Sequence, residues 1–118
     1  MRSLLIVDDD VALLQALSRF LSDHGYHVSS CSTFEDAKHE ISTVRPDIVV
    51  TDVRLGAFNG LQLALLARDM RPDVRLIVFS GFDDKVLKEE ARRLGATYLV
   101  KPVSGFSLLQ ELQRNGSG

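Results

Sequence analysis

Five polar side chains stand at or directly after the ends of short apolar runs in this sequence: Asp8, Asp9, Asp52, Ser80 and Lys101. Carboxylates that lie close together repel one another, so either their pKa values rise or a cation neutralises them. A hard divalent ion is the simpler answer, because Mg²⁺ takes carboxylate, carbonyl, water and phosphate oxygens as ligands. A carboxylate nucleophile, Mg²⁺, an amine and a hydroxyl together supply what phosphoryl transfer requires. The expected chemistry is therefore the formation of an aspartyl phosphate.

Asp52 is the expected reactive group, because it ends the run Ile-Val-Val-Thr-Asp at residues 48–52. Pro46 precedes this run and Gly56 and Gly60 follow it, which suits an interior parallel strand that leads into a loop and a helix. In open α/β sheets, chemistry gathers beyond the carboxyl ends of such strands. Taken alone, Asp52 could equally be a solvated loop acid. The other polar side chains at strand ends favour the reactive role.

Strand-like and helix-like segments alternate five times along the chain. Short runs of apolar and β-branched residues predict strands at residues 4–7, 26–31, 48–52, 74–79 and 98–100. Apolar residues at helical spacing predict helices over residues 11–24, 34–44, 60–70, 83–94 and 106–112. The expected fold class is α/β, a doubly wound (βα)5 three-layer sandwich with one five-stranded parallel sheet and right-handed crossovers. Parallel strands bring their polar ends to one edge of the sheet.

Capping signals support several of these helix limits. The second helix follows a tetrapeptide of capping-box form that runs from Ser32 to Glu35. Asp83 and Asp84 suit the positive end of the fourth helix dipole, and Gly95 supplies the stop after that helix. The tripeptide Arg-Pro-Asp occurs twice, before the third and the fourth strand. The same turn is therefore expected twice.

Length and composition predict a single domain. The 118 residues, 45% hydrophobic and 25% charged, provide one sizeable core over residues 1–114, and residues 115–118 are expected to be a flexible tail or a cloning remnant. A net charge of -2 gives no basic stripe, so direct nucleic-acid binding is not expected. No apolar run approaches the about 18 residues of a membrane span, and we expect a cytoplasmic protein without a membrane partner.

Softer metals are not expected, because the cysteine and the histidines show no ligand spacing (Cys31, His24, His27 and His39). Cys31 cannot form an internal disulfide and is expected to be a small buried hydrophobe. The histidines are expected to be surface or packing residues.

From about residue 4 to residue 112, the chain resembles the receiver domain of bacterial two-component response regulators, a CheY-like superfamily. The resemblance implies the flavodoxin-like strand order 2-1-3-4-5. It implies that Asp52 is the phosphoacceptor, that Asp9 binds Mg²⁺ directly and that Asp8 acts mainly through water. The backbone carbonyl of Arg54, two residues beyond the acceptor, would complete the protein ligands. Such a domain is an autocatalytic phosphoacceptor with slow self-dephosphorylation, not a turnover enzyme.

The same resemblance gives roles to residues at the later strand ends. Ser80 and Lys101 match the hydroxyl and the lysine that contact the phosphoryl group, and the bond to Pro102 is similar to one that is cis in the family. Tyr98 matches the switch aromatic that turns inward when Ser80 moves toward the phosphate. The donor would be a sensor histidine kinase or a histidine phosphotransfer protein.

The output surface implied by the resemblance is the face made by the fourth helix, the fifth strand and the fifth helix. Candidate contact residues on this face are Lys85, Val86, Leu87 and Tyr98. The face is expected to dock an output domain, a target protein or a second copy of the chain, which would make a homodimer.

The sequence departs from the family pattern in the loop after the acceptor. Gly56 stands where many relatives have proline, and glycine has more conformations to lose on folding than proline. We therefore expect a more mobile acceptor loop and weaker Mg²⁺ binding. Gly81 similarly loosens the loop after Ser80. Arg54 and Phe82 lie where the family tunes the lifetime of its phosphoryl group.

A different class of protein, a phosphatase, also fits part of the sequence. The run Leu-Ile-Val-Asp-Asp-Asp-Val resembles the first motif of haloacid-dehalogenase-like phosphatases, in which Asp8 would be the nucleophile and Asp10 the acid/base. Ser80 and Lys101 would serve in that site as well. The chain is short for that fold with its cap, and Asp52 would have no role.

Each motif residue also has a structural explanation when it is taken alone. Residues 8–10 could be a plain helix N-cap run, and Lys101 a surface lysine before a proline. Ser80 could be a turn serine and Tyr98 a half-buried strand aromatic. A receiver-like binding module without phosphorylation would lack an acidic residue or the lysine, and none is missing. A flavin-binding relative of the fold is disfavoured, because its phosphate would meet three acids after the first strand.

Overall fold

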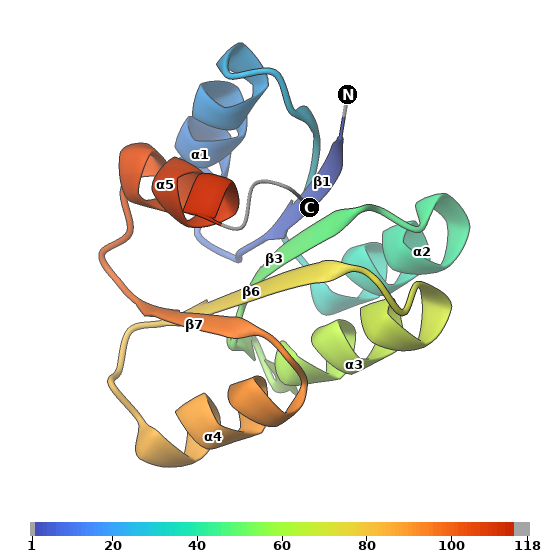
Figure 1. The fold of residues 1–118 in the computed structure, drawn as a ribbon, viewed down its shortest axis with the longest axis vertical. Helices are drawn as coiled ribbons and strands as arrows, with labels where there is room; N and C mark the ends of the chain where they lie inside the picture. The colour runs from blue at the N-terminus through green and yellow to red at the C-terminus, as the bar shows by residue number, and fades with distance from the viewer. Residues whose placement is uncertain (1, 115–118) are drawn as a thin grey trace.

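The computed structural model describes residues 2–114, in which strands and helices alternate (Figure 1). The elements are β1 (Ser3–Val7), α1 (Val11–Asp23), β2 (His27–Cys31), α2 (Phe34–Val44), β3 (Ile48–Asp52), β4 (Arg54–Leu55), β5 (Phe58–Asn59), α3 (Leu61–Met70), β6 (Arg75–Ser80), α4 (Lys85–Arg93), β7 (Thr97–Val100) and α5 (Gly105–Arg114). The predicted tail at 115–118 lies outside the described residues.

Five parallel strands form the central sheet in the order β2-β1-β3-β6-β7. Because β4 and β5 form a separate two-stranded sheet, this order is the predicted 2-1-3-4-5 of the five main strands. Helices α1 and α5 cover one face of the sheet, and α2, α3 and α4 cover the other (Figure 1). The predicted three-layer α/β sandwich is confirmed.

Side-chain alternation along the strands divides the core between the two faces. Leu4 and Ile6 of β1 pack with α1 and α5, whereas Leu5 and Val7 pack with α2 and α3. This is the two-residue period of a strand that is buried on both sides. Every residue of β3 is buried, so this strand is the centre of the fold.

The register of the central strands brings their carboxyl ends level. Val7 of β1 pairs with Thr51 of β3, and Asp52 pairs with Phe79 of β6. Asp8 and Asp52 therefore leave the sheet at the same edge, one strand apart. The alternation of strands and helices in the sequence predicts this shared edge, because it implies a parallel sheet.

The structure identifies the residues that cap α2 and α4. Thr33, not Ser32, is the N-cap of α2, and its hydroxyl accepts a hydrogen bond from the N–H of Asp36 at 3.2 Å. In α4 the cap is Asp84, whose carboxylate accepts from two backbone N–H groups, while Asp83 pairs with Lys88. Both capping signals were correct to within one residue, because neighbouring residues of the same type compete for the cap position.

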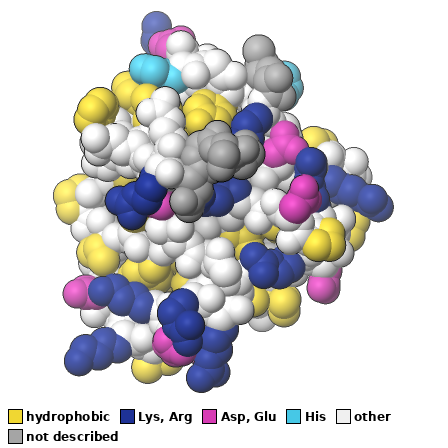
Figure 2. All heavy atoms as spheres, in the orientation of Figure 1, with side chains coloured by type: hydrophobic (Ala, Val, Ile, Leu, Met, Phe, Trp, Pro, Cys, Tyr) yellow, Lys and Arg dark blue, Asp and Glu magenta, His cyan; other side chains and the backbone are white. Residues whose placement is uncertain are grey.

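The molecular surface carries charges of both signs. Figure 2 shows lysine and arginine side chains with acidic neighbours near α4, where Arg92 and Arg93 pair with Glu89. None of the helices in residues 2–114 combines the length and the apolar character that crossing a bilayer requires.

Candidate functional site

Three carboxylates converge beyond the ends of β1 and β3. Single oxygen atoms of Asp8, Asp9 and Asp52 all lie within 4.8 Å of one another. Asp8 is fully buried and Asp52 is 7% exposed, whereas Asp9 is exposed to solvent. Hard cations prefer such oxygen ligands, and one exposed carboxylate gives an ion access from solvent. The cluster can therefore hold a divalent metal ion.

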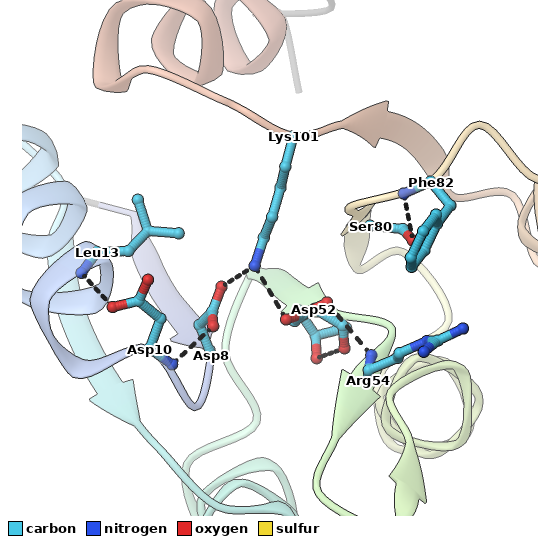
Figure 3. Close-up of polar contacts among 9 residues, drawn as sticks. Asp8, Asp10, Leu13, Asp52, Arg54, Ser80, Phe82 and Lys101 are labelled. Carbon is cyan, nitrogen blue, oxygen red and sulfur yellow. Dashed lines mark hydrogen bonds and ion pairs between the residues drawn. The ribbon is translucent and has the colours of Figure 1, made fainter.

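Lys101 reaches this cluster from the end of β7 (Figure 3). Its Nζ donates to Asp8 Oδ2 at 2.8 Å and to Asp52 Oδ2 at 3.0 Å. The Lys101–Pro102 peptide bond is cis, as the resemblance implied. One ammonium group thus links the acids of two different strands.

Burial and pairing act against each other on the ionisable groups of this site. Burial is the main cause that raises the pKa of Asp8, and the charge of Asp52 adds to it, while the hydrogen bond from Lys101 opposes both. For Lys101, burial lowers the pKa, but the bonds to Asp8 and Asp52 and their charges together outweigh it, so the pKa is raised. The ammonium form of Lys101 is therefore retained, and a further cation would relieve the remaining repulsion between the carboxylates.

Asp10 caps the N-terminus of α1. Its carboxylate accepts from the N–H of Leu13 at 3.2 Å, and its own N–H donates to Asp8 Oδ1 at 2.9 Å (Figure 3). Asp10 is thus the N-cap of α1, which is the structural explanation that the sequence offers for residues 8–10. The structure therefore gives Asp10 a helix-capping role.

The backbone after β3 holds the second oxygen of Asp52. The N–H of Arg54 donates to Asp52 Oδ1 at 3.2 Å, so each carboxylate oxygen of Asp52 has a donor in the protein. At Gly60 the chain comes back to the backbone of Asp52. A Cβ at position 60 would lie 1.9 Å from the carbonyl oxygen of Asp52, which only glycine avoids.

The segment between Asp52 and Gly60 is a β-hairpin, whereas the sequence predicts a loop there. Strands β4 and β5 pair through Leu55 and Phe58, and the two residues between them, Gly56 and Ala57, form the turn. Gly56 has φ +61°, and a positive φ at the first turn position alone is the pattern of a type II′ turn. Proline cannot adopt this φ, so the glycine is required by the turn. The expected mobility of this segment stays a prediction.

In the register of the hairpin, the Arg54 carbonyl makes no hydrogen bond between β4 and β5. In a hairpin closed by two residues, the pair beside the turn exchanges hydrogen bonds and the next pair does not. Arg54 and Asn59 are that next pair, and the following pair is bonded again, with Gly60 N–H donating to Val53 C=O at 2.6 Å. Arg54 therefore has its N–H on Asp52 and a carbonyl that the hairpin does not use.

Ser80 and Tyr98 share one partner, Phe82. The N–H of Phe82 donates to Ser80 Oγ at 3.2 Å, and the Tyr98 hydroxyl donates to the Phe82 carbonyl at 2.7 Å. The guanidinium of Arg54 lies 4.9 Å from the centre of the Phe82 ring, so Phe82 also contacts the hairpin (Figure 3). From the sequence, Phe82 is identified only by its position, because nothing in the sequence indicates a shared backbone partner.

The fold and the site together define a CheY-like receiver. A model of the response regulator receiver domain matches residues 4–113, and the chain belongs to this family. It is 34% identical over 116 residues to the photosynthetic apparatus regulatory protein RegA of Rhodobacter capsulatus, across 98% of this chain and 63% of that protein. It is 37% identical over 117 residues to the acid tolerance regulatory protein ActR of Sinorhizobium medicae strain WSM419, across 98% of this chain and 60% of that protein.

Solved structures agree with this assignment. A CheY-like receiver domain protein from Methanospirillum hungatei JF-1 superposes with a TM-score of 0.91 at 27% identity, covering 98% of this chain and 93% of that one. A response regulator from Burkholderia pseudomallei, with a phosphorylated aspartic acid, a calcium ion and citrate, superposes with a TM-score of 0.89 at 30% identity. The match covers 99% of this chain and 69% of that one. The chain spans 63% and 60% of the two curated relatives named above.

Proposed function

We propose that Asp52 accepts a phosphoryl group from the phosphohistidine of a sensor kinase or phosphotransfer protein, or from a small acyl phosphate, in a Mg²⁺-dependent reaction. The observation that carries this proposal is the position of the Lys101 ammonium group between Asp8 and Asp52. A positive charge next to a carboxylate nucleophile is what a transferring phosphoryl group requires. The phosphorylated aspartic acid of the Burkholderia relative supports the same chemistry.

The reaction is a direct displacement at phosphorus. A carboxylate oxygen of Asp52 attacks and an O–P bond forms. The bond from phosphorus to the leaving atom of the donor breaks, and its electron pair stays on that atom, which is the ring nitrogen of a phosphohistidine or the carboxylate oxygen of a small acyl phosphate. Lys101 and the hydroxyl of Ser80 donate to the phosphoryl oxygens, and the Arg54 N–H keeps the carboxylate in position. Water later attacks phosphorus, which restores Asp52 and releases inorganic phosphate, so the domain turns over slowly and only on itself.

The donor set of the site fits Mg²⁺. Asp9 and Asp52 would ligate it directly, Asp8 mainly through water, and the Arg54 carbonyl would be the neutral ligand, since the hairpin ladder leaves it free. When bound, Mg²⁺ would neutralise charge on the phosphoryl oxygens.

Phosphorylation would bias a two-state element made of Ser80, Tyr98 and their shared partner Phe82. If the Ser80 hydroxyl turns toward a phosphoryl group on Asp52, it gives up the bond from the Phe82 N–H. Tyr98 responds because its hydroxyl bonds the carbonyl of the same residue. The change would reach the face formed by α4, β7 and α5, which would contact an output domain, a target protein or a second copy of the chain.

Phosphate labelling tests the acceptor. The protein is incubated with Mg²⁺ and acetyl phosphate, the acyl phosphate is trapped, and the modified residue is mapped. We expect modification at Asp52 and none in Asp52→Asn. Label on Asp8 would support the phosphatase alternative, and undiminished label in Asp52→Asn would overturn the proposal.

Asp10→Asn is the matched control for this experiment. Asparagine is as good an N-cap as aspartate, so α1 keeps its start and labelling of Asp52 should be unchanged. In the phosphatase alternative the same substitution removes the acid/base and would slow turnover severely.

A further inference from the structure

Two aromatic rings join the hairpin to the beginning of α2. The rings of Phe34 and Phe58 stack with their centroids 4.6 Å apart and their planes 14° apart. Phe34 is the first residue of α2 and is half-buried against the core, whereas Phe58 of β5 is 47% exposed. The stack stabilises this contact beyond the area that the two rings bury.

The stack bridges a cleft beside the acidic cluster. The cleft has a volume of about 270 Å³ and lies between the start of α2 and the hairpin, with Asp9 at its edge. Leu55 and Gly56 form part of the hairpin wall, and Phe34 and Phe58 are both in the lining. The hairpin therefore meets α2 across a partly open space, where a single strong contact has a large effect on its position.

The hairpin carries the effect of this contact to Asp52. Phe58 pairs with Leu55, the neighbour of Arg54, and Arg54 donates its N–H to Asp52 Oδ1. The base of the hairpin is held by the close approach of Gly60 to Asp52. Beside the turn, the buried Leu55 anchors β4 in the core, and its partner Phe58 is the residue of β5 that contacts α2 through its ring. The ring of Phe58 therefore restrains the β5 side of the hairpin.

We infer that the Phe34–Phe58 stack is a clamp that positions the β4–β5 hairpin and thereby sets the affinity of the site for Mg²⁺. Both rings are positioning residues, because they act through Arg54 and not on the ion. The inference rests on the proposed function only for the identity of the ion. With the clamp open, the Arg54 N–H leaves Asp52 Oδ1, and the ion meets a less preorganised site.

The experiment compares Phe58→Ala and Phe34→Ala with wild type in two measurements. The first is amide hydrogen exchange at Arg54 in metal-free protein, by NMR. The second is the dissociation constant for Mg²⁺ alone, by calorimetry without a phosphodonor. We expect exchange to become faster and the dissociation constant to rise by about threefold to tenfold, the range for loss of an aromatic pair that controls the population of a binding-competent state.

Three further variants make the result specific. Phe58→Tyr keeps the stack and should retain the wild-type values. The double variant should be no weaker than the weaker single variant, because both changes break the same contact. Val44→Ala, at the other end of α2 and with a side chain exposed to 52%, should leave both measurements unchanged.

The clamp is overturned if exchange or affinity stays at the wild-type value in Phe58→Ala, or if Val44→Ala gives the same loss. A wild-type protein that binds Mg²⁺ but takes no phosphoryl group on Asp52 would count against the proposed function alone. The exchange measurement needs neither metal nor donor, so the two failures are distinguishable.

Discussion

At the scale of single residues, the main-chain carbonyl of Asp52 leaves no room for a side chain at position 60. Gly60 has φ -62° and ψ -19°, a conformation that alanine adopts readily. Gly60→Ala therefore changes little in backbone preference, and any loss reports the clash with Asp52. We expect the free energy of unfolding to fall by about 3 kcal/mol, measured by urea denaturation.

Gly81→Ala is the matched control for this prediction. A Cβ at position 81 meets nothing within 4 Å, and Gly81 does not have a positive φ. Its free energy of unfolding should stay within about 0.5 kcal/mol of wild type. A Gly60→Ala protein as stable as Gly81→Ala would contradict the predicted clash.

Most residues that gather at the site were predictable, and their secondary contacts were not. Asp8, Asp52 and Lys101 follow apolar runs, and parallel strand order alone brings such residues to one edge. The roles of Phe34 and Phe58 depend on ring positions across a cleft, which no spacing in the sequence encodes. The two glycines at positions 56 and 60 gave a signal for a tight return of the chain, although the hairpin itself was missed.

At the scale of elements, the two Arg-Pro-Asp turns meet at the edge of the sheet opposite the acids. Arg71 of the second turn pairs with Asp47 of the first at 2.6 Å and with Asp73 of its own at 3.2 Å. The Asp47 carboxylate also accepts from the N–H and the hydroxyl of Ser3, at the start of β1. One carboxylate thus connects β1, the entrance to β3 and the turn before β6.

Asp47→Asn tests this connection. Asparagine keeps an oxygen for Ser3 but loses the charge that faces Arg71. We expect the free energy of unfolding at pH 7 to fall by about 1 kcal/mol, the difference between charged and neutral hydrogen bonds. Asp73→Asn is the control, because its carboxylate is 82% exposed and exposed pairs contribute little.

The effect of Asp47→Asn should depend on pH in a defined direction. The Ser3 N–H is the main cause that lowers the pKa of Asp47 below its ordinary value of 3.8, and Arg71 contributes. A group with a lowered folded pKa stabilises fully above its unfolded value and loses that contribution as pH falls through the folded value. The difference from wild type should therefore be constant from pH 7 to about pH 5 and shrink below 3.8. A difference that grows on acidification would contradict this linkage.

The elements themselves were predictable in proportion to their length. The five main strands and five helices carry apolar periods that span several residues, and their predicted limits differ from the observed ones by at most two residues. Strands β4 and β5 have two residues each, which is too short for any period. Only a turn rule applied to Gly56 could have found them.

At the scale of the whole molecule, the site places three carboxylates against one ammonium group in a fold whose net charge is -2. The metal-free protein therefore keeps an excess of negative charge at one edge of its sheet. Stability is lower for this reason until a cation binds. The charge that makes the site useful for binding is the charge that makes the unliganded fold less stable.

Asp9→Asn separates these two consequences. In EDTA the substitution relieves repulsion, and we expect the free energy of unfolding to rise by about 0.5 kcal/mol. In Mg²⁺ at tenfold above its dissociation constant, wild type should gain about 1.4 kcal/mol by ligand linkage, and Asp9→Asn, which has lost a ligand, much less. The two proteins should exchange their order of stability between EDTA and Mg²⁺ in urea denaturation. Asp69 is an exposed acid on α3, so Asp69→Asn should change the free energy of unfolding by the same amount in EDTA and in Mg²⁺. If the order of stability of wild type and Asp9→Asn stays the same in both conditions, the cluster does not bind the ion through the Asp9 carboxylate.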